Sequence, residues 1–174
     1  MRYQIVCQLR LRSRAVQSVL VLVCAAVSLT ACGWRLQGTS KLSPTMMVTY
    51  VDADDRYTEF NRALRDRLRV SGAKLADRAG DATAVVRITK DESGQRVLSV
   101  SARNTPEEYE VFYAVEYSVA SGGTELIPVQ RLEVTRDYSY DTTAVLAKQR
   151  EQAILREALA QDLAGLVVRR LASL

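Results

Sequence analysis

The sequence predicts an α+β fold, a two-layer sandwich in which two helices pack on one face of a mainly antiparallel four-stranded sheet. Strand-like segments separated by turn residues fill the middle of the chain, an amphipathic helix precedes most of them, and a long amphipathic helix follows. Because each of these elements has one apolar side, the helices and the sheet must cover each other. Two layers are the simplest arrangement that does so.

The first 31 residues have the layout of a secretory signal peptide, because a basic segment without acids precedes an apolar run that ends in small residues. This run is shorter than the roughly 20 residues that a transmembrane helix needs. The segment Leu29-Thr30-Ala31-Cys32 resembles the lipobox of bacterial lipoproteins, which predicts cleavage after Ala31 and attachment of lipid to the Cys32 sulfur. A short membrane span with an incidental cysteine is the alternative interpretation.

Removal of residues 1–31 changes the composition of the chain. The whole sequence of 174 residues has 24 basic and 20 acidic side chains, three cysteines and no histidine. Four arginines and no acid lie in residues 1–31, so 143 residues with 20 basic and 20 acidic side chains remain. Cys7 and Cys24 leave with the signal peptide and lipid occupies Cys32, so the mature chain is expected to have no disulfide.

The lipid anchor predicts a location at a membrane surface. Several acyl chains on Cys32 would hold the protein on a bilayer without a transmembrane segment. Residue 33 is glycine rather than aspartate, which resembles the sorting rule for enterobacterial lipoproteins of the outer membrane. Residues 32–44 are then a short tether before a domain at 45–174, and Trp34 lies either at the lipid headgroups or against the edge of that domain.

The first strand and the first helix of the domain follow this tether. Residues 46–51 form a short apolar run that ends at an acidic turn, which predicts a strand. Helical spacing of apolar residues predicts a helix over 58–71, with Gly72 as its stop. Its outer side is expected to carry Arg62, Arg65 and Arg69. These arginines either bind anionic lipid or form a solvated face, and a secreted protein is not expected to meet nucleic acid.

The middle of the chain predicts strands and hairpins. Residues 84–90 and 97–102 predict a hairpin around the turn at 91–94, and residues 73–83 predict a loop or a short edge strand. Alternating apolar and polar residues predict a strand over 109–119, and a Gly-Gly turn then leads into a strand over 127–140. The tyrosines concentrated on these last two strands either pack in the core or form a partner-binding surface.

A long helix is predicted from about Thr143 to Leu171, with Asp141 or Thr142 as its N-cap. Gly165 within it predicts a closely packed neighbour, because glycine costs a helix about 1 kcal/mol relative to alanine. The apolar stripe of this helix consists of Leu155, Leu159, Leu163, Leu166 and Val167.

Little in the sequence points to catalysis or to a metal. Without histidine there is no imidazole for a nucleophile pair or for a metal site. The cluster Asp52-Ala53-Asp54-Asp55 could bind calcium, but it lacks the glycine and the distal glutamate of an EF-hand loop, which favours a solvated turn. We therefore expect no enzyme, no metal site and no cofactor.

Four segments of the mature chain match the sequence pattern of one family. They are Cys32-Gly33-Trp34-Arg35-Leu36, Arg136-Asp137-Tyr138, Ala144-Val145-Leu146-Ala147-Lys148 with Glu151, and Arg169-Arg170-Leu171. In these segments the chain resembles the LptE (RlpB) family of lipopolysaccharide-assembly lipoproteins, over nearly all of its mature length. It departs from the family at Leu36-Gln37-Gly38, where the family often has Leu-Arg-Gly.

The resemblance implies two helices on a four-stranded sheet, in agreement with the fold predicted above. It also implies that the chain plugs the outer-membrane barrel LptD in a 1:1 complex, helps that barrel to assemble and binds lipopolysaccharide. By match to the family, Arg103 and Lys148 are the residues expected to contact lipopolysaccharide, at one end of the domain; solvated turn charges are the alternative. The alternative function is that of a periplasmic lipid-binding or scaffolding lipoprotein of another envelope complex.

Overall fold

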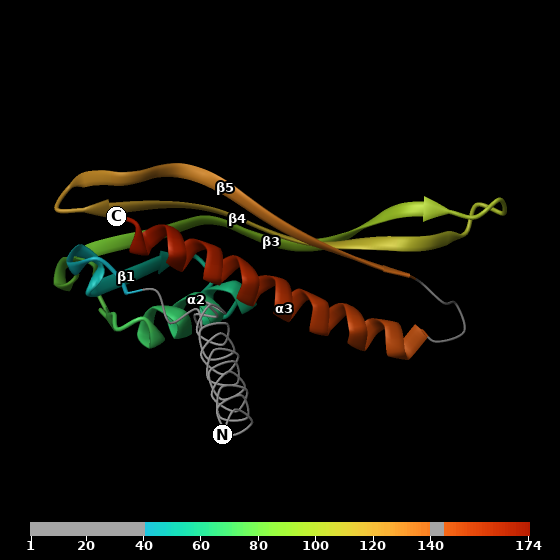
Figure 1. Ribbon diagram of the computed structural model, residues 1–174, viewed down its shortest axis with the longest axis horizontal. Coiled ribbons are helices and arrows are strands. Elements are labelled where there is room, and N and C mark those ends of the chain that lie inside the picture. Colours follow the sequence, from blue (N-terminus) through green and yellow to red (C-terminus); the bar gives the residue numbers. More distant parts are fainter. Residues whose placement is uncertain (1–40, 140–144) are drawn as a thin grey trace, which may run out of the picture. The chain divides into compact units, whose positions relative to one another are not determined.

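Five strands form one mixed sheet in the computed structural model, which describes residues 41–139 and 145–174 (Figure 1). In spatial order the strands are β2, β1, β3, β4 and β5. β1 is parallel to both of its neighbours, whereas β4 is antiparallel to both β3 and β5. The bounds are Val48–Ala53 for β1, Lys74–Leu75 for β2, Ala84–Val100 for β3, Pro106–Ser121 for β4 and Thr124–Ser139 for β5.

The expected sheet of four mainly antiparallel strands is therefore wrong in the number of strands and in the direction of β1. The additional strand, β2, has two residues and lies in the segment 73–83, for which the sequence predicts a loop or a short edge strand. Helix α2, Glu59–Val70, connects β1 to β2 and returns the chain in the same direction, so the two strands pair in parallel. Parallel pairing of this kind joins residues that are far apart in the sequence, so the pattern of neighbouring residues does not reveal it.

β3 is one strand of 17 residues, so the predicted turn at 91–94 is wrong. Asp91 Oδ2 instead accepts a hydrogen bond from Thr58 Oγ1 at 2.6 Å. Gly94 lies beneath the Phe112 ring of β4, and a Cβ on it would come within 2.7 Å of that ring. These residues serve contacts between elements, and the chain turns at 101–105.

Two helices cover one face of the sheet, as the sequence predicts (Figure 1). At the start of α2, Asn61 N donates to Thr58 Oγ1 at 3.1 Å, and Gly72, at a φ of 94°, follows the last turn. Two short 3-10 helices precede β1 and β3, Pro44–Met46 (η1) and Ala79–Asp81 (η2). No helix among the described residues is long and apolar enough to cross a membrane.

The second helix, α3, spans Val145–Ala172. The close neighbour predicted for Gly165 is present, because a Cβ there would lie 3.2 Å from Arg67 Nη1 of α2. Leu166, which the sequence places on the apolar stripe, is 39% exposed, whereas Val168 and Leu171, which the predicted stripe leaves out, are buried.

The core lies between the sheet and the helices. On β4 the predicted alternation is confirmed, because every second residue from Val111 to Val119 is buried. Leu42, within the predicted tether 32–44, is also buried in this core. The helices contribute Phe60, Leu64, Leu68, Leu159, Leu163, Val167 and Leu171.

The outer halves of β3 and β4 extend beyond the part of the sheet that α2 covers (Figure 1). On β3, the buried residues are Ala84, Val86 and Ile88, all in the first third of the strand. From position 89 to 100 no residue of β3 is buried. The pairing of β3 with β4 continues to Val100 and Pro106, with register shifts between Val97 and Val100, so this outer hairpin is paired sheet with little core beneath it.

Several predicted features lie outside the described residues. They include the signal peptide 1–31, Cys32 and Trp34 of the tether, Tyr140, and the candidate helix caps Asp141 and Thr142.

Candidate functional site

The turn that carries Arg103 is held by its own hydrogen bonds. Asn104 N donates to Ser101 O at 2.9 Å, and Thr105 N donates to Ser101 Oγ at 3.2 Å. Asn104 has a φ of 61°, a conformation that asparagine adopts more readily than most residues. The backbone of Arg103 is thereby fixed, while its side chain is exposed and has no hydrogen bond or ion pair within the described residues.

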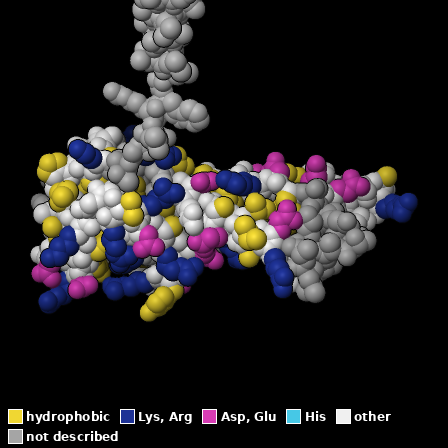
Figure 2. All heavy atoms as spheres, turned by 60° about the horizontal axis from the view of Figure 1, so that its bottom comes forward, with side chains coloured by type: hydrophobic (Ala, Val, Ile, Leu, Met, Phe, Trp, Pro, Cys, Tyr) yellow, Lys and Arg dark blue, Asp and Glu magenta, His cyan; other side chains and the backbone are white. Residues whose placement is uncertain are grey.

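Exposed apolar side chains precede this turn on the last residues of β3 in the outer hairpin. Val97, Leu98 and Val100 of β3 are 49%, 49% and 52% exposed. Figure 2 shows hydrophobic and basic side chains close together at this end of the sheet. An apolar surface beside a cation without a partner fits an amphiphilic molecule that carries negative charge.

Lys148 lies in the first turn of α3, and its side chain is outside the described part of the chain. Strand pairing sets Ser139, the last residue of β5, opposite Glu108, near the start of β4. The turn with Arg103 and the end of β5 therefore belong to the same end of the sheet, and α3 begins shortly after β5 (Figure 1). A contact between Arg103 and Lys148 through one ligand stays a prediction.

A network of ion pairs crosses the sheet face that points away from the helices. Arg131 of β5 reaches Glu92 of β3 at 2.7 Å, Glu116 of β4 at 3.5 Å and Glu133 at 3.1 Å. Arg96 of β3 joins it by pairing with Glu133 at 2.5 Å and with Glu110 at 3.0 Å. The guanidinium of Arg96 also lies 4.6 Å from the centre of the Phe112 ring.

Hydrogen bonds in this network favour the ionised form of two of its carboxyl groups, those of Glu92 and Glu133. The hydrogen bond from Arg131 lowers the pKa of Glu92, and hydrogen bonds from Arg131 and Arg96 lower the pKa of Glu133. The same contacts raise the pKa of both arginines. Carboxylates held in the ionised form do not supply the protonated member of an acid–base pair. The members of the network lie on β3, β4 and β5, so the network joins three strands. Local sequence patterns do not reveal it, because these residues come together only through the register of the paired strands.

The tyrosines of the last two strands are mainly structural. Tyr113 and Tyr117 are fully buried, so the core alternative holds for them. The Tyr109 and Tyr138 rings stack with their centres 5.7 Å apart. Among the described tyrosines, Tyr57 is the most exposed, and it lies just before α2 rather than on either strand.

The predicted basic face of α2 is wrong for one of its three arginines. Arg65 is half-buried, and it donates from Nε to Asn61 Oδ1 at 2.7 Å and from Nη2 to the Val51 carbonyl at 3.2 Å. Burial lowers its pKa. Arg62 and Arg69 are exposed, and they pair with Glu157 at 3.9 Å and with Asp66 at 2.7 Å.

The acidic cluster 52–55 begins in the last two residues of β1 and makes contacts with neighbouring residues. Asp52 pairs with Arg87 of β3 at 3.0 Å, and Asp55 Oδ1 accepts a hydrogen bond from Tyr57 N at 2.7 Å. Within the described part of the chain, no group of three or more potential ligands is arranged to hold a metal ion.

Comparisons with known proteins match both the sequence and this fold. A family model described as LptE, Lipopolysaccharide-assembly, matches residues 47–171. The LPS-assembly lipoprotein LptE of Pectobacterium atrosepticum is 28% identical over 156 residues, covering 87% of this chain and 83% of that protein. The relative of that name from Yersinia enterocolitica is also 28% identical, over 88% of this chain and 74% of its own length.

Solved structures of bacterial lipoproteins have the same fold. Rare lipoprotein B from Shewanella oneidensis is 32% identical and superposes with a TM-score of 0.65, over 72% of this chain and 94% of its own. Lipoprotein B from Nitrosomonas europaea, at 23% identity, has a TM-score of 0.68 and covers 81% of this chain and 91% of its own, which supports the fold alone. Since the family model spans all five strands and nearly all of both helices, this chain belongs to the LptE family of lipopolysaccharide-assembly proteins.

Proposed function

We propose that this protein binds lipopolysaccharide and plugs the outer-membrane barrel LptD in a 1:1 complex, without catalysis. Membership of the LptE family gives the chain a role in lipopolysaccharide assembly. In this proposal residues 1–31 are a signal peptide, lipid on Cys32 anchors the protein to the periplasmic side of the outer membrane, and residues 32–44 are its tether. The relatives named lipoproteins support the anchor.

The outer hairpin carries the proposal that lipopolysaccharide binds. Lipopolysaccharide combines acyl chains with phosphate groups, and Arg103 offers a guanidinium without an ion-pair partner in the described chain beside exposed Val97, Leu98 and Val100. A guanidinium binds phosphate through two parallel hydrogen bonds, and a lysine ammonium acts as a point charge. Lys148 is proposed to supply that second charge from the start of α3.

The open face of the sheet supports the proposed place in a barrel. The interior of a large outer-membrane barrel is polar. The network around Arg131 and Arg96 gives this sheet face charged side chains that pair with one another within the domain. We expect a charged sheet face of this kind to contact the hydrated, polar interior of a barrel rather than lipid.

A charge-reversal experiment tests the lipopolysaccharide site. We expect the double variant Arg103→Glu and Lys148→Glu to lose most binding in a pull-down with immobilised lipopolysaccharide, because two attractive charges become repulsive. The matched control is Arg78→Glu, an exposed arginine in the segment between β2 and β3 that pairs only with Asp81 among the described residues. If the double variant binds as much lipopolysaccharide as the wild type while its melting temperature is unchanged, the assignment of this site is wrong.

A further inference from the structure

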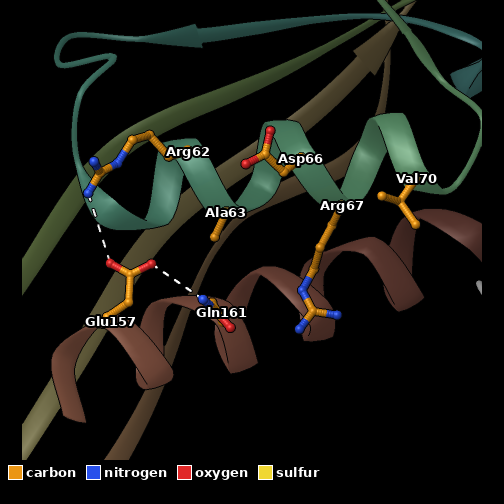
Figure 3. Close-up of a pocket in the computed structure, with 7 residues that line it drawn as sticks. All are labelled: Arg62, Ala63, Asp66, Arg67, Val70, Glu157 and Gln161. Carbon is orange, nitrogen blue, oxygen red and sulfur yellow. Dashed lines mark hydrogen bonds and ion pairs between the residues drawn. The ribbon is translucent and has the colours of Figure 1, made fainter. Parts of the chain in front are cut away.

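Two arginine side chains converge on Gly165 in the groove between α2 and α3. Around the position that a Cβ of residue 165 would take, Arg67 Nη1 lies at 3.2 Å and Arg169 Nη1 at 3.5 Å. Figure 3 shows Arg67 reaching from α2 across to α3. The absence of a side chain at Gly165 lets both guanidinium groups occupy the same small region.

Neither guanidinium is neutralised within the described part of the chain. Arg67 and Arg169 are exposed, and neither guanidinium has an ion pair or hydrogen bond there. The nearby acids have other partners: Asp66 pairs with Arg69 at 2.7 Å, and Glu157 faces Arg62 at 3.9 Å (Figure 3). Two like charges a few ångströms apart repel each other, whereas an anion placed between them is attracted to both.

The groove beside Arg67 has room for a ligand. A cavity of about 530 Å³ runs along it from Arg62 and Glu157 to Arg67 and Val70. Val70 is largely exposed at the end of α2, so the rim of the cavity near Arg67 is partly apolar. Figure 2 shows further basic side chains on this side of the domain, where α2 and α3 lie.

We infer that Arg67 and Arg169 form a binding site for a phosphate group, carried either by a lipid headgroup or by free phosphate. Two guanidinium groups match the geometry of phosphate oxygens, since each can donate two parallel hydrogen bonds. At 1.5 Å per residue along α3, Arg169 lies about 30 Å from Lys148. The site is therefore separate from the proposed lipopolysaccharide site, and it does not depend on that proposal.

Titration of the full-length protein in uncharged detergent tests this site. The probes are inorganic phosphate and dihexanoyl phosphatidic acid, with chloride at equal ionic strength as the blank, and NMR follows the Nε–H resonances of the arginines. We expect both probes to shift the resonances of Arg67 and Arg169. Arg67→Gln and Arg169→Gln should each weaken binding about tenfold or more, because each removes a charge-assisted hydrogen-bonding group.

A matched control variant and the comparison of the two probes distinguish the possible outcomes. Arg170→Gln changes the residue next to Arg169 and should leave the affinity unchanged. Tighter binding of phosphatidic acid than of inorganic phosphate identifies a lipid headgroup as the ligand, and equal affinity identifies free phosphate. The inference is overturned if neither probe shifts the two resonances, if Arg67→Gln binds as tightly as the wild type, or if Arg170→Gln weakens binding as much as Arg169→Gln.

Discussion

At the scale of single residues, Asp91 joins the start of α2 to the sheet. Thr58 Oγ1 donates to Asp91 at 2.6 Å and accepts from Asn61 N at 3.1 Å, so one hydroxyl serves both the helix cap and the strand. Tyr113 Oη of β4 accepts from Phe60 N at 3.2 Å. Burial raises the pKa of Asp91, and burial also raises the pKa of Tyr113. A carboxylate is thus held at this junction although its charged form is disfavoured.

This raised pKa predicts how stability depends on pH. The folded chain takes up a proton at Asp91 more readily than the unfolded chain, so the contribution of this group is full below its unfolded pKa and is lost as pH rises through its folded pKa. Wild type should therefore gain stability relative to Asp91→Asn as the pH falls from 7 to 4. Urea unfolding of both proteins at several pH values measures the difference, and a difference that does not change with pH would contradict this explanation.

Gly94 is a second residue whose type is explained by a contact between strands. Any side chain larger than hydrogen would meet the Phe112 ring, since a Cβ would lie 2.7 Å from it. Gly94→Ala should therefore lower the free energy of unfolding by about 1–3 kcal/mol, the usual cost of overpacking. Gly80→Ala is the control, because nothing lies within 4 Å of its Cβ position. Equal urea midpoints for the two variants would show that Phe112 does not depend on this gap.

At the scale of elements, the sequence predicted the features that arise from neighbouring residues and missed those that depend on residues far apart in the chain. The alternation on β4 and the stop at Gly72 arise from neighbouring residues, and the structure confirms them. β2, the parallel pairing of β1 and the network around Arg131 depend on residues far apart in the chain. The turn at 91–94 was wrongly predicted because Asp91 and Gly94, typical turn residues, serve tertiary contacts instead.

The same distinction holds for the candidate sites. Arg103 was predicted in a turn and lies in one, although that turn closes a longer hairpin than expected. The pair of Arg67 and Arg169 was not predicted, because only the packing of α2 on α3 brings the two arginines together. Gly165 was the one indication in the sequence that this region was unusual.

The network on the open sheet face predicts a salt-dependent stability. Arg131→Gln should destabilise the domain at low ionic strength, because Glu92, Glu116 and Glu133 lose a shared counter-charge. The loss should shrink in 1 M salt, where screening weakens all of these charges. Arg78→Gln, which removes one exposed pair with Asp81, is the control and should change little. Thermal melts at low and high salt that show the same loss for Arg131→Gln would argue against the network.

At the scale of the whole molecule, charge and structure together describe a domain with distinct surfaces. The net charge of +4 in the complete sequence comes from the four arginines of the proposed signal peptide, so the proposed mature chain is neutral. Within that neutral chain, one sheet face carries a network of ion pairs, the outer hairpin presents apolar side chains with Arg103, and the helix groove holds two arginines whose guanidinium groups have no partners among the described residues. These surfaces fit a protein that works through binding.

If this chain is the plug subunit of a barrel, purification from the membrane should recover the two proteins together. The tagged full-length protein would be extracted from outer membranes in mild detergent, purified by the tag and analysed for mass and stoichiometry. The account predicts a stable 1:1 complex with LptD. A free monomer, or a stable complex with a different envelope protein, would contradict it and favour a periplasmic lipid-binding or scaffolding role.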